Sequence, residues 1–195
     1  LYVSLKRMEA AVETLKQCLE LEKNPAHPMI IQAKNSLAGV YLSKGDIREA
    51  EQTVDEVIKE NPKSVEAHFT KGKILLSRRN GTDAVSEFRT VVTDRPGYVP
   101  AYLGLAEAHV MNREIDLARD TLTNALKADP DSRDVLRALA RVYLLKKDPE
   151  NAEAQLKKIL ENHPEDHQVR AELGDLLAAR KDFEGSKQQY DAIKN

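Results

Sequence analysis

The sequence has little of what marks disulfide-bonded or membrane-spanning proteins. Cys18 is the only cysteine among the 195 residues, so the chain cannot form a disulfide framework of its own. It falls within an apolar helical pattern, which predicts a small buried hydrophobe rather than a reactive thiol. No apolar run approaches the roughly 18–20 residues of a membrane span. We therefore expect no direct membrane insertion by this stretch of chain.

Charge of one sign is not in excess either. The chain has 30 basic and 32 acidic residues, a formal net charge of −2. This balance provides no electrostatic footprint for a nucleic-acid backbone or an anionic membrane. The basic clusters Arg78-Arg79 and Lys146-Lys147 fall at predicted turns. We expect protein or peptide partners and no nucleic acid.

Patterns that carry catalytic or metal chemistry are missing as well. The eight glycines form neither a phosphate-binding loop nor a dinucleotide fingerprint. Among the histidines, only His163 and His167 are close in sequence. Pro164 lies between them and interrupts the helical turn that two metal ligands on one face would need. We predict solvated histidines at both positions, no catalytic residues, no bound metal and no cofactor.

The sequence does have a repeat of 34 residues. Small residues recur at this interval in two columns, because helices packed about 8–10 Å apart need small side chains where their backbones meet. The first column is Ala38, Gly72, Ala106, Ala140 and Gly174; the second is Ala50, Ala84, Ala118, Ala152 and Ser186. Prolines that end each unit follow the same interval at Pro62, Pro96, Pro130 and Pro164. Each unit is therefore predicted to be a pair of helices.

The clearest copy of the unit spans residues 99–130. Apolar residues at helical spacing predict helices over residues 100–111 and 115–127, with a turn at Asn112-Arg113-Glu114 between them. A helix pair of this size cannot bury its apolar faces alone, so neighbouring pairs must stack. The prediction is an all-α solenoid of antiparallel helix pairs forming a single domain over residues 1–195.

The chain divides into one truncated unit and five further units. Residues 1–24 are predicted to begin in the middle of a first helix and then supply a complete second helix. The further units span residues 25–62, 63–96, 97–130, 131–164 and 165–195. The step from Ala11 to Ala50 is 39 residues, which predicts a proline-containing loop and a longer helix after it. Helix N-caps are expected at Asp46, Ser64, Ser132 and Asp148, the last followed by Pro149.

These features resemble the tetratricopeptide repeat family. The resemblance is carried by Leu105-Ala106, Leu173-Gly174 and the run Ala118, Leu122, Ala125 and Pro130. The aromatic residue usual near the start of the first helix is present only as Tyr102, and the other units have Lys34, His68, Leu136 and Arg170 there. The resemblance implies a right-handed superhelix and a non-enzymatic scaffold or adaptor. In that family the first helices line a concave groove that holds a peptide or a partner helix.

The resemblance also selects groove residues, in three rows on the first helices. The first row is Asn35, Phe69, Leu103, Arg137 and Ala171. The middle row is Gly39, Lys73, Glu107, Arg141 and Asp175. The third row is Leu42, Leu76, Val110, Leu144 and Ala178. From these rows we predict a peptide-binding groove formed by Asn35, Phe69, Lys73, Leu103, Glu107, Arg137, Arg141 and Asp175.

The alternating charges of the middle row have two interpretations. In the first, each side chain reaches the neighbour 34 residues away, and such exposed pairs contribute only about 0.2–1 kcal/mol each. In the second, Arg137 and Arg141 receive a partner carboxylate, which guanidinium groups bind bidentately, while Phe69 and Leu103 accept an apolar side chain. The chaperone-binding carboxylate clamp is not expected, because Leu103 and Glu107 stand where it needs basic or asparagine residues.

Two other functions remain open from the sequence. One is a structural spacer or self-assembly module that associates through uncapped ends. The other is the regulatory segment of a larger enzyme or export-system protein. Because the chain begins at Leu1 and has no terminal capping helix, we expect a fragment of a longer bacterial array. The compartment is open: cytoplasmic by default, periplasmic or membrane-associated if a missing N-terminal part carries a signal.

Overall fold

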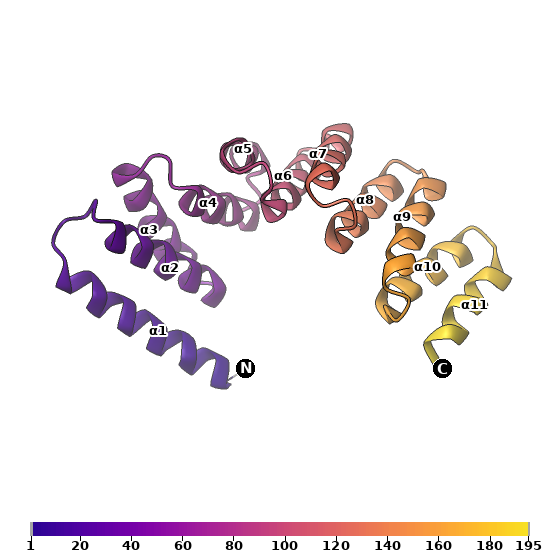
Figure 1. The fold of residues 1–195 in the computed structure, drawn as a ribbon, viewed down its shortest axis with the longest axis horizontal. Coiled ribbons are helices and arrows are strands. Elements are labelled where there is room, and N and C mark those ends of the chain that lie inside the picture. The colour runs from indigo at the N-terminus through magenta and orange to yellow at the C-terminus, as the bar shows by residue number, and fades with distance from the viewer. Residues whose placement is uncertain (1, 195) are drawn as a thin grey trace. The chain divides into compact units, whose positions relative to one another are not determined.

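The structure, a computed structural model, describes residues 2–194 and the side chains of residues 6–193. Within this range all regular elements are α-helices (Figure 1). They are α1 (Tyr2–Leu21), α2 (Pro28–Lys44), α3 (Ile47–Glu60), α4 (Val65–Ser77), α5 (Gly81–Asp94), α6 (Val99–Met111), α7 (Ile115–Ala128), α8 (Arg133–Leu145), α9 (Pro149–Asn162), α10 (His167–Ala179) and α11 (Phe183–Lys194).

The helices form two compact units that divide within α6, after Gly104. In the first unit α1 packs on α2, α2 packs on α3 and α4, and α4 packs on α3 and α5. In the second unit α7 packs on α8, α8 on α9, α9 on α10 and α10 on α11. Stacked helix pairs therefore build each unit, which confirms the predicted all-α fold class. We call α2, α4, α6, α8 and α10 the first helices, and α3, α5, α7, α9 and α11 the second helices.

The small-residue columns lie at the helix contacts, as predicted. Ala50, Ala84, Ala118 and Ala152 have no exposed surface. A Cβ atom added to Gly72 would lie 2.8 Å from the ring of Phe88, which is itself fully buried. Such a distance is shorter than a Cβ atom can tolerate, so the close helix contact requires glycine at this position.

The turns inside the helix pairs share one backbone conformation. The turn after the first helix contains a residue with a positive φ in all five pairs: Gly45 (86°), Arg79 (58°), Arg113 (64°), Lys147 (59°) and Lys181 (67°). These residues are 34 apart, like the packing columns. The left-handed conformation is unfavourable for residues with a Cβ atom, so four of the five turns hold a strained residue.

Two of the four predicted side-chain caps are confirmed and two are wrong. Ser64 Oγ accepts from the Ala67 amide at 3.3 Å, and Asp148 Oδ1 accepts from the Asn151 amide at 3.1 Å. Asp46 and Ser132 occupy N-cap positions but accept no capping bond from the backbone. The Asp46 carboxylate instead lies 2.9 Å from Lys44 Nζ.

The N-terminal segment differs from its prediction. Residues 2–21 form one continuous helix, α1, not the end of one helix followed by a second. The segment has no proline or glycine to interrupt it, so one helical stripe runs through its whole length. Cys18 on this helix is half-buried, less covered than expected.

The predicted loop and longer helix after α1 are confirmed. Residues 22–27 connect α1 to α2, and His27 Nδ1 accepts from the Met29 amide at 3.2 Å to cap α2. Pro28 occupies the first helical position, where a missing N–H has no consequence. Helix α2 has 17 residues, against 13 in α4.

Candidate functional site

The eight predicted groove residues all lie on first helices. Asn35 is on α2, Phe69 and Lys73 are on α4, and Leu103 and Glu107 are on α6. Arg137 and Arg141 are on α8, and Asp175 is on α10. The first and middle rows differ in exposure: every first-row residue is half-buried, whereas the four charged residues of the middle row are exposed.

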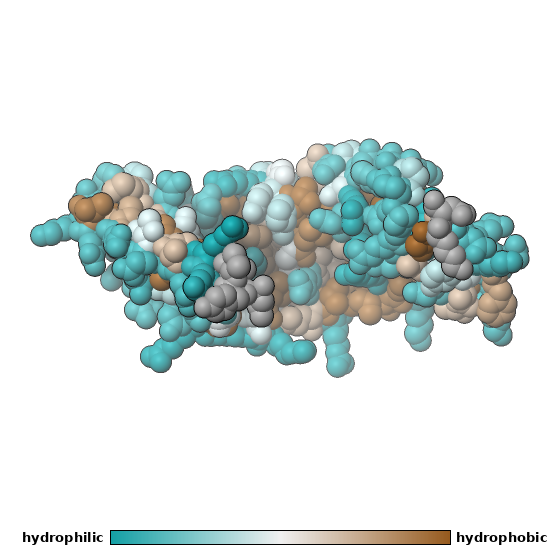
Figure 2. Space-filling view, turned by 90° about the horizontal axis from the view of Figure 1, so that it is seen from below, coloured by the Kyte–Doolittle hydropathy of each residue, from teal (hydrophilic) through white to brown (hydrophobic). Residues whose placement is uncertain are grey.

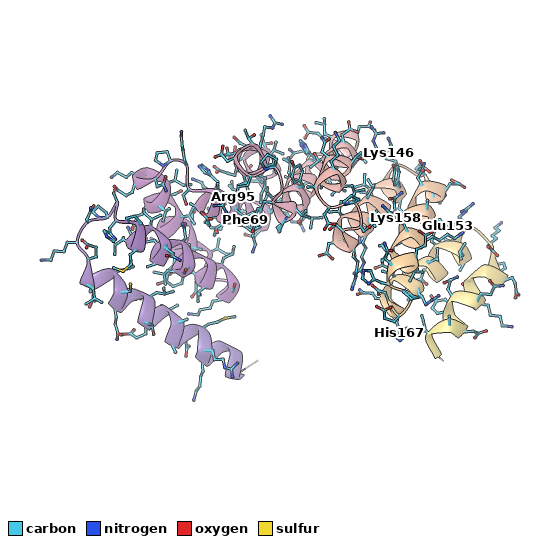
Figure 3. The ribbon with its side chains drawn as sticks, viewed as in Figure 1. Phe69, Arg95, Lys146, Glu153, Lys158 and His167 are labelled. Carbon is cyan, nitrogen blue, oxygen red and sulfur yellow. The ribbon has the colours of Figure 1, made fainter. Side chains whose placement is uncertain are left out.

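In the first unit two first-row residues, Asn35 and Phe69, contact the start of the following first helix or the turn before it. Asn35 Nδ2 donates to Ser64 Oγ at 3.1 Å. The Phe69 ring lies edge-on to Tyr98, with centroids 5.2 Å apart, and to the buried Phe88 at 5.8 Å. Figure 3 labels Phe69 among the side chains of this unit. These residues join neighbouring pairs while one side of each remains accessible.

Lys73 is the exposed cation of the first unit's groove residues. Its Nζ lies 5.7 Å from the centre of the Phe69 ring, within the range of a cation–π contact. Leu103, also in the first unit, is half-buried on α6. Phe69 and Lys73 therefore provide an aromatic ring with a positive charge beside it.

In the second unit Arg137 is already bound to a carboxylate. Its Nε donates to both oxygens of Glu172 at 2.9 Å, and its Nη2 also donates to Glu172 Oε1. The bond to this carboxylate raises the pKa of the Arg137 guanidinium. Glu172 therefore occupies the position that the sequence prediction gave to a partner's carboxylate.

Arg141 remains open to solvent. Its Nη2 lies 3.8 Å from the same Glu172 oxygen, and 67% of its side chain is exposed. Asp175 accepts from the Tyr190 hydroxyl at 2.6 Å, which raises the pKa of Tyr190. Lys73, Arg141 and Asp175 thus each have a partner other than the residue 34 positions away that the ladder interpretation requires.

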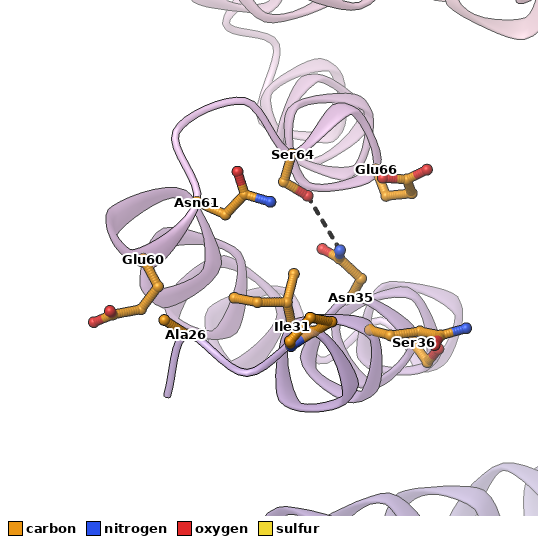
Figure 4. Close-up of a pocket in the computed structure, with 10 residues that line it drawn as sticks. Ala26, Ile31, Asn35, Ser36, Glu60, Asn61, Ser64 and Glu66 are labelled. Atoms are coloured by element: carbon orange, nitrogen blue, oxygen red, sulfur yellow. Dashed lines mark hydrogen bonds between the residues drawn. The ribbon is translucent and has the colours of Figure 1, made fainter. Parts of the chain in front are cut away.

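A cavity of about 640 Å³ lies at the junction between α2 and α4 (Figure 4). Its wall includes Asn35 from the predicted groove, and the rest comes from the loop before α2, from α2 itself, from the end of α3 and from the start of α4. The sequence analysis missed it. The available signal was the pair Asn35 and Ser64, which is smaller than the equivalent pair Phe69 and Tyr98 one repeat later.

The described residues provide no sign of metal or membrane chemistry. No group of three or more His, Cys, Asp or Glu side chains among them is placed to hold a metal ion. His163 and His167 are both exposed, as predicted. No described helix is long and apolar enough to cross a membrane. Figure 2 shows one face of the molecule, where hydrophilic side chains surround smaller apolar patches.

Stacked helix pairs with small residues at a fixed interval define a helical-repeat protein. Family models for the tetratricopeptide repeat match residues 1–25, 35–99, 75–142 and 117–171. The chain belongs to the tetratricopeptide repeat family. Proteins of this fold are generally non-catalytic scaffolds for protein–protein interaction, with proteins or peptides as partners.

Individual proteins are similar to this chain at lower identity. Superkiller complex protein 3 from Homo sapiens is 27% identical over 110 residues, which are 56% of this chain and 7% of that protein. A tetratricopeptide repeat protein from Parabacteroides merdae is 14% identical, with a TM-score of 0.78 over 98% of this chain and 74% of that one. YrrB, described as having an unusual peptide-binding site, is 18% identical, with a TM-score of 0.67 over 92% and 86%. The structural likenesses show the fold.

Proposed function

We propose that this protein is a non-enzymatic scaffold that holds an extended segment of a partner protein on the face formed by its first helices. The observation that carries the proposal is the uniform exposure of the charged middle row, Lys73, Glu107, Arg141 and Asp175, beside a half-buried first row. Exposed charges next to partly covered apolar and polar side chains are suited to an extended ligand, because they can contact its side chains individually. The proposed contact residues are Asn35, Phe69, Lys73 and Leu103 in the first unit, and Glu107, Arg137, Arg141 and Asp175 in the second unit.

Arg141 is the residue of this surface that we expect to contact an acidic side chain. It is more exposed than Arg137, and it shares Glu172 with Arg137 at a longer distance. A partner carboxylate can bind Arg141 without displacing Glu172. Binding to both arginines at once requires Glu172 to move.

The competition with Glu172 gives a direct prediction. Replacing Glu172→Gln removes the internal negative charge and leaves both guanidinium groups free for an external one. We expect an acidic peptide that binds this surface to bind the variant about threefold to fivefold more tightly, the effect of one partly exposed ion pair. Isothermal titration of the same peptide against both proteins measures the difference. Unchanged or weaker binding would show that the arginines do not receive the peptide.

A peptide selection tests the proposed function as a whole. Peptides from a random displayed library are selected on the intact chain, and their affinities are measured for Arg141→Glu and for Lys127→Glu. Lys127 is an exposed lysine on the second helix α7 and serves as the matched charge reversal. The proposal expects Arg141→Glu to weaken the acidic peptides by about fivefold or more, while Lys127→Glu leaves them unchanged. Equal affinity of the peptides for all three proteins would show that the middle row does not bind them.

A second candidate function is self-assembly through the last helix pair. The observation that favours it is the exposure of two aromatic side chains on α11, Phe183 at 69% and Tyr190 at 37%. Light scattering over a range of protein concentrations tests it, with Phe183→Ser as the variant. Association that the variant abolishes would support assembly, and a monomer at every concentration would reject it.

A further inference from the structure

The cavity between α2 and α4 has the properties of a binding subsite. Seven of its ten lining residues are polar or charged, with Gln32, Asn35 and Asn61 contributing amides and Ser64 a hydroxyl, but apolar atoms, such as those of Ile31, make up the larger part of its surface. These side chains come from the start of α2, the end of α3 and the start of α4, as Figure 4 shows. An occupant can therefore form hydrogen bonds with these polar groups and apolar contacts with the rest of the wall.

One polar atom of the wall lacks a partner. Asn35 Oδ1 is buried and accepts no hydrogen bond from any described residue, while Asn35 Nδ2 donates to Ser64 Oγ. The Ser64 hydroxyl can accept from or donate to the amide, so turning the amide over would only exchange the unpaired acceptor for an unpaired donor. A buried polar group without a partner is unfavourable. A ligand peptide group, which has both an N–H and a C=O, can satisfy either orientation after a small rotation of the side chain.

The charge of the cavity is negative. Glu60 and Glu66 line it, and no lysine or arginine does. Glu66 is paired with Arg95 at 2.8 Å on the surface. Glu60 is exposed and forms no ion pair with a described residue. The unpaired carboxylate at the rim favours a positively charged occupant.

The next junction along the first unit explains why this cavity is open. There Phe69 and Tyr98 stand at the positions of Asn35 and Ser64, each 34 residues later. Their rings are in contact at 5.2 Å and fill the corresponding space. The small polar pair Asn35 and Ser64 therefore leaves room that an aromatic pair would remove.

We propose that the cavity between α2 and α4 is a subsite for a basic side chain of the bound partner, with Asn35 pairing a peptide group of the partner and Glu60 pairing the ammonium group. This inference rests on the proposed function and names the chemistry of one part of the partner. It requires a lysine within an extended segment, flanked by residues small enough to let the backbone approach Asn35.

The probe for this subsite is the blocked tripeptide acetyl-Gly-Lys-Gly-amide, and the matched probe replaces lysine with uncharged norleucine. Each is titrated into the isotope-labelled chain, and amide chemical shifts are followed by NMR. We expect the lysine peptide to shift the amides around Asn35, Asn61 and Ser64, and to bind about threefold to fivefold more tightly than the norleucine peptide. High salt should reduce this difference.

Two variants separate the parts of the proposal. The double variant Asn35→Phe with Ser64→Tyr installs the residues of the next junction, where the fold already accommodates them, and should abolish the shifts. Glu60→Gln should make the two peptides bind equally, whereas Glu161→Gln, an exposed glutamate at the equivalent end of α9, should leave the preference intact.

The inference is overturned if the lysine peptide shifts no amides of this junction, or if the filled double variant binds it as well as the wild type does. Either result leaves the proposed function intact when peptides selected on the chain still depend on Arg141. Loss of the Arg141 dependence with the lysine effect retained would instead reject the proposed groove and keep the subsite.

Discussion

At the residue scale, equivalent positions in different repeats do the same task with different chemistry. The position usually occupied by an aromatic residue holds His68 in the first unit and Arg170 in the second. His68 places Nε2 2.9 Å from the Pro62 carbonyl oxygen and Nδ1 2.6 Å from Glu87. Arg170 donates from Nε to the Pro164 carbonyl at 2.9 Å. Polar side chains thus tie the loop to the helix where an aromatic ring would pack.

This substitution of hydrogen bonding for packing predicts a stability effect. Arg170→Met keeps the apolar stem and removes the bonds to Pro164 and to Gln189. Because hydrogen bonds from a charged group are among the stronger ones, we expect the free energy of unfolding, measured in urea, to fall by about 1–2 kcal/mol. An unchanged midpoint of urea unfolding would mean that the apolar stem of the side chain alone holds the loop at Pro164.

The strained turns give a second prediction at this scale. Lys147 has a φ of 59° and an exposed side chain, so Lys147→Gly removes strain without removing a contact. We expect a gain of about 0.5–1 kcal/mol in the free energy of unfolding. The reciprocal change Gly45→Ala, at a φ of 86°, should cost stability. Denaturant unfolding of both variants measures the two effects, and a loss on Lys147→Gly would contradict the strain argument.

At the element scale, most of the helix pairs could be predicted because each depends on local signals that recur. The bounds expected for the unit at 99–130 agree with α6 and α7 to within one residue. The cap at Asp46 failed because a nearby cation, Lys44, competes for the carboxylate, and sequence position alone does not decide that competition.

The proposed site could be predicted less fully than the helices. Its eight residues lie on first helices, as expected, because the periodicity fixes which positions share a helix face. The partner of Arg137 is Glu172, 35 residues away, whereas the periodicity couples only positions 34 apart. The cavity depends on the volumes of Asn35 and Ser64 on two different helices, and a one-dimensional pattern does not report the space between them.

The cap of α9 predicts a pH dependence. Hydrogen bonds from Asn151 hold the pKa of Asp148 below its usual range. The stabilisation from Asp148 is therefore present above the ordinary aspartate pKa and is lost as the pH falls through the lowered value. Asp148→Asn keeps a capping oxygen but does not titrate, so it should lose less stability on acidification. Urea unfolding at neutral and acidic pH compares the two, and parallel losses would count against the cap.

At the scale of the whole molecule, the first and second helices of the repeats have different roles. The second helices contribute fully buried residues such as Val54, Phe88 and Leu122 to the core. The first helices contribute core residues on one side and the exposed charges of the middle row on the other. Ion pairs link successive pairs within a unit: Lys71 on α4 reaches Asp55 on α3 at 2.6 Å, and Lys146 after α8 reaches Asp116 on α7 at 2.5 Å. Many internal contacts therefore hold the helix pairs together, and few of them use the exposed charges of the middle row.

The central claim is that the first helices carry the partner. The most direct measurement is an amide chemical-shift map of the intact chain on addition of a peptide selected on it. The account predicts that the shifted amides cluster on α4, α6, α8 and α10, around Lys73, Glu107, Arg141 and Asp175. Shifts confined to the second helices, with those four residues unaffected, would contradict it.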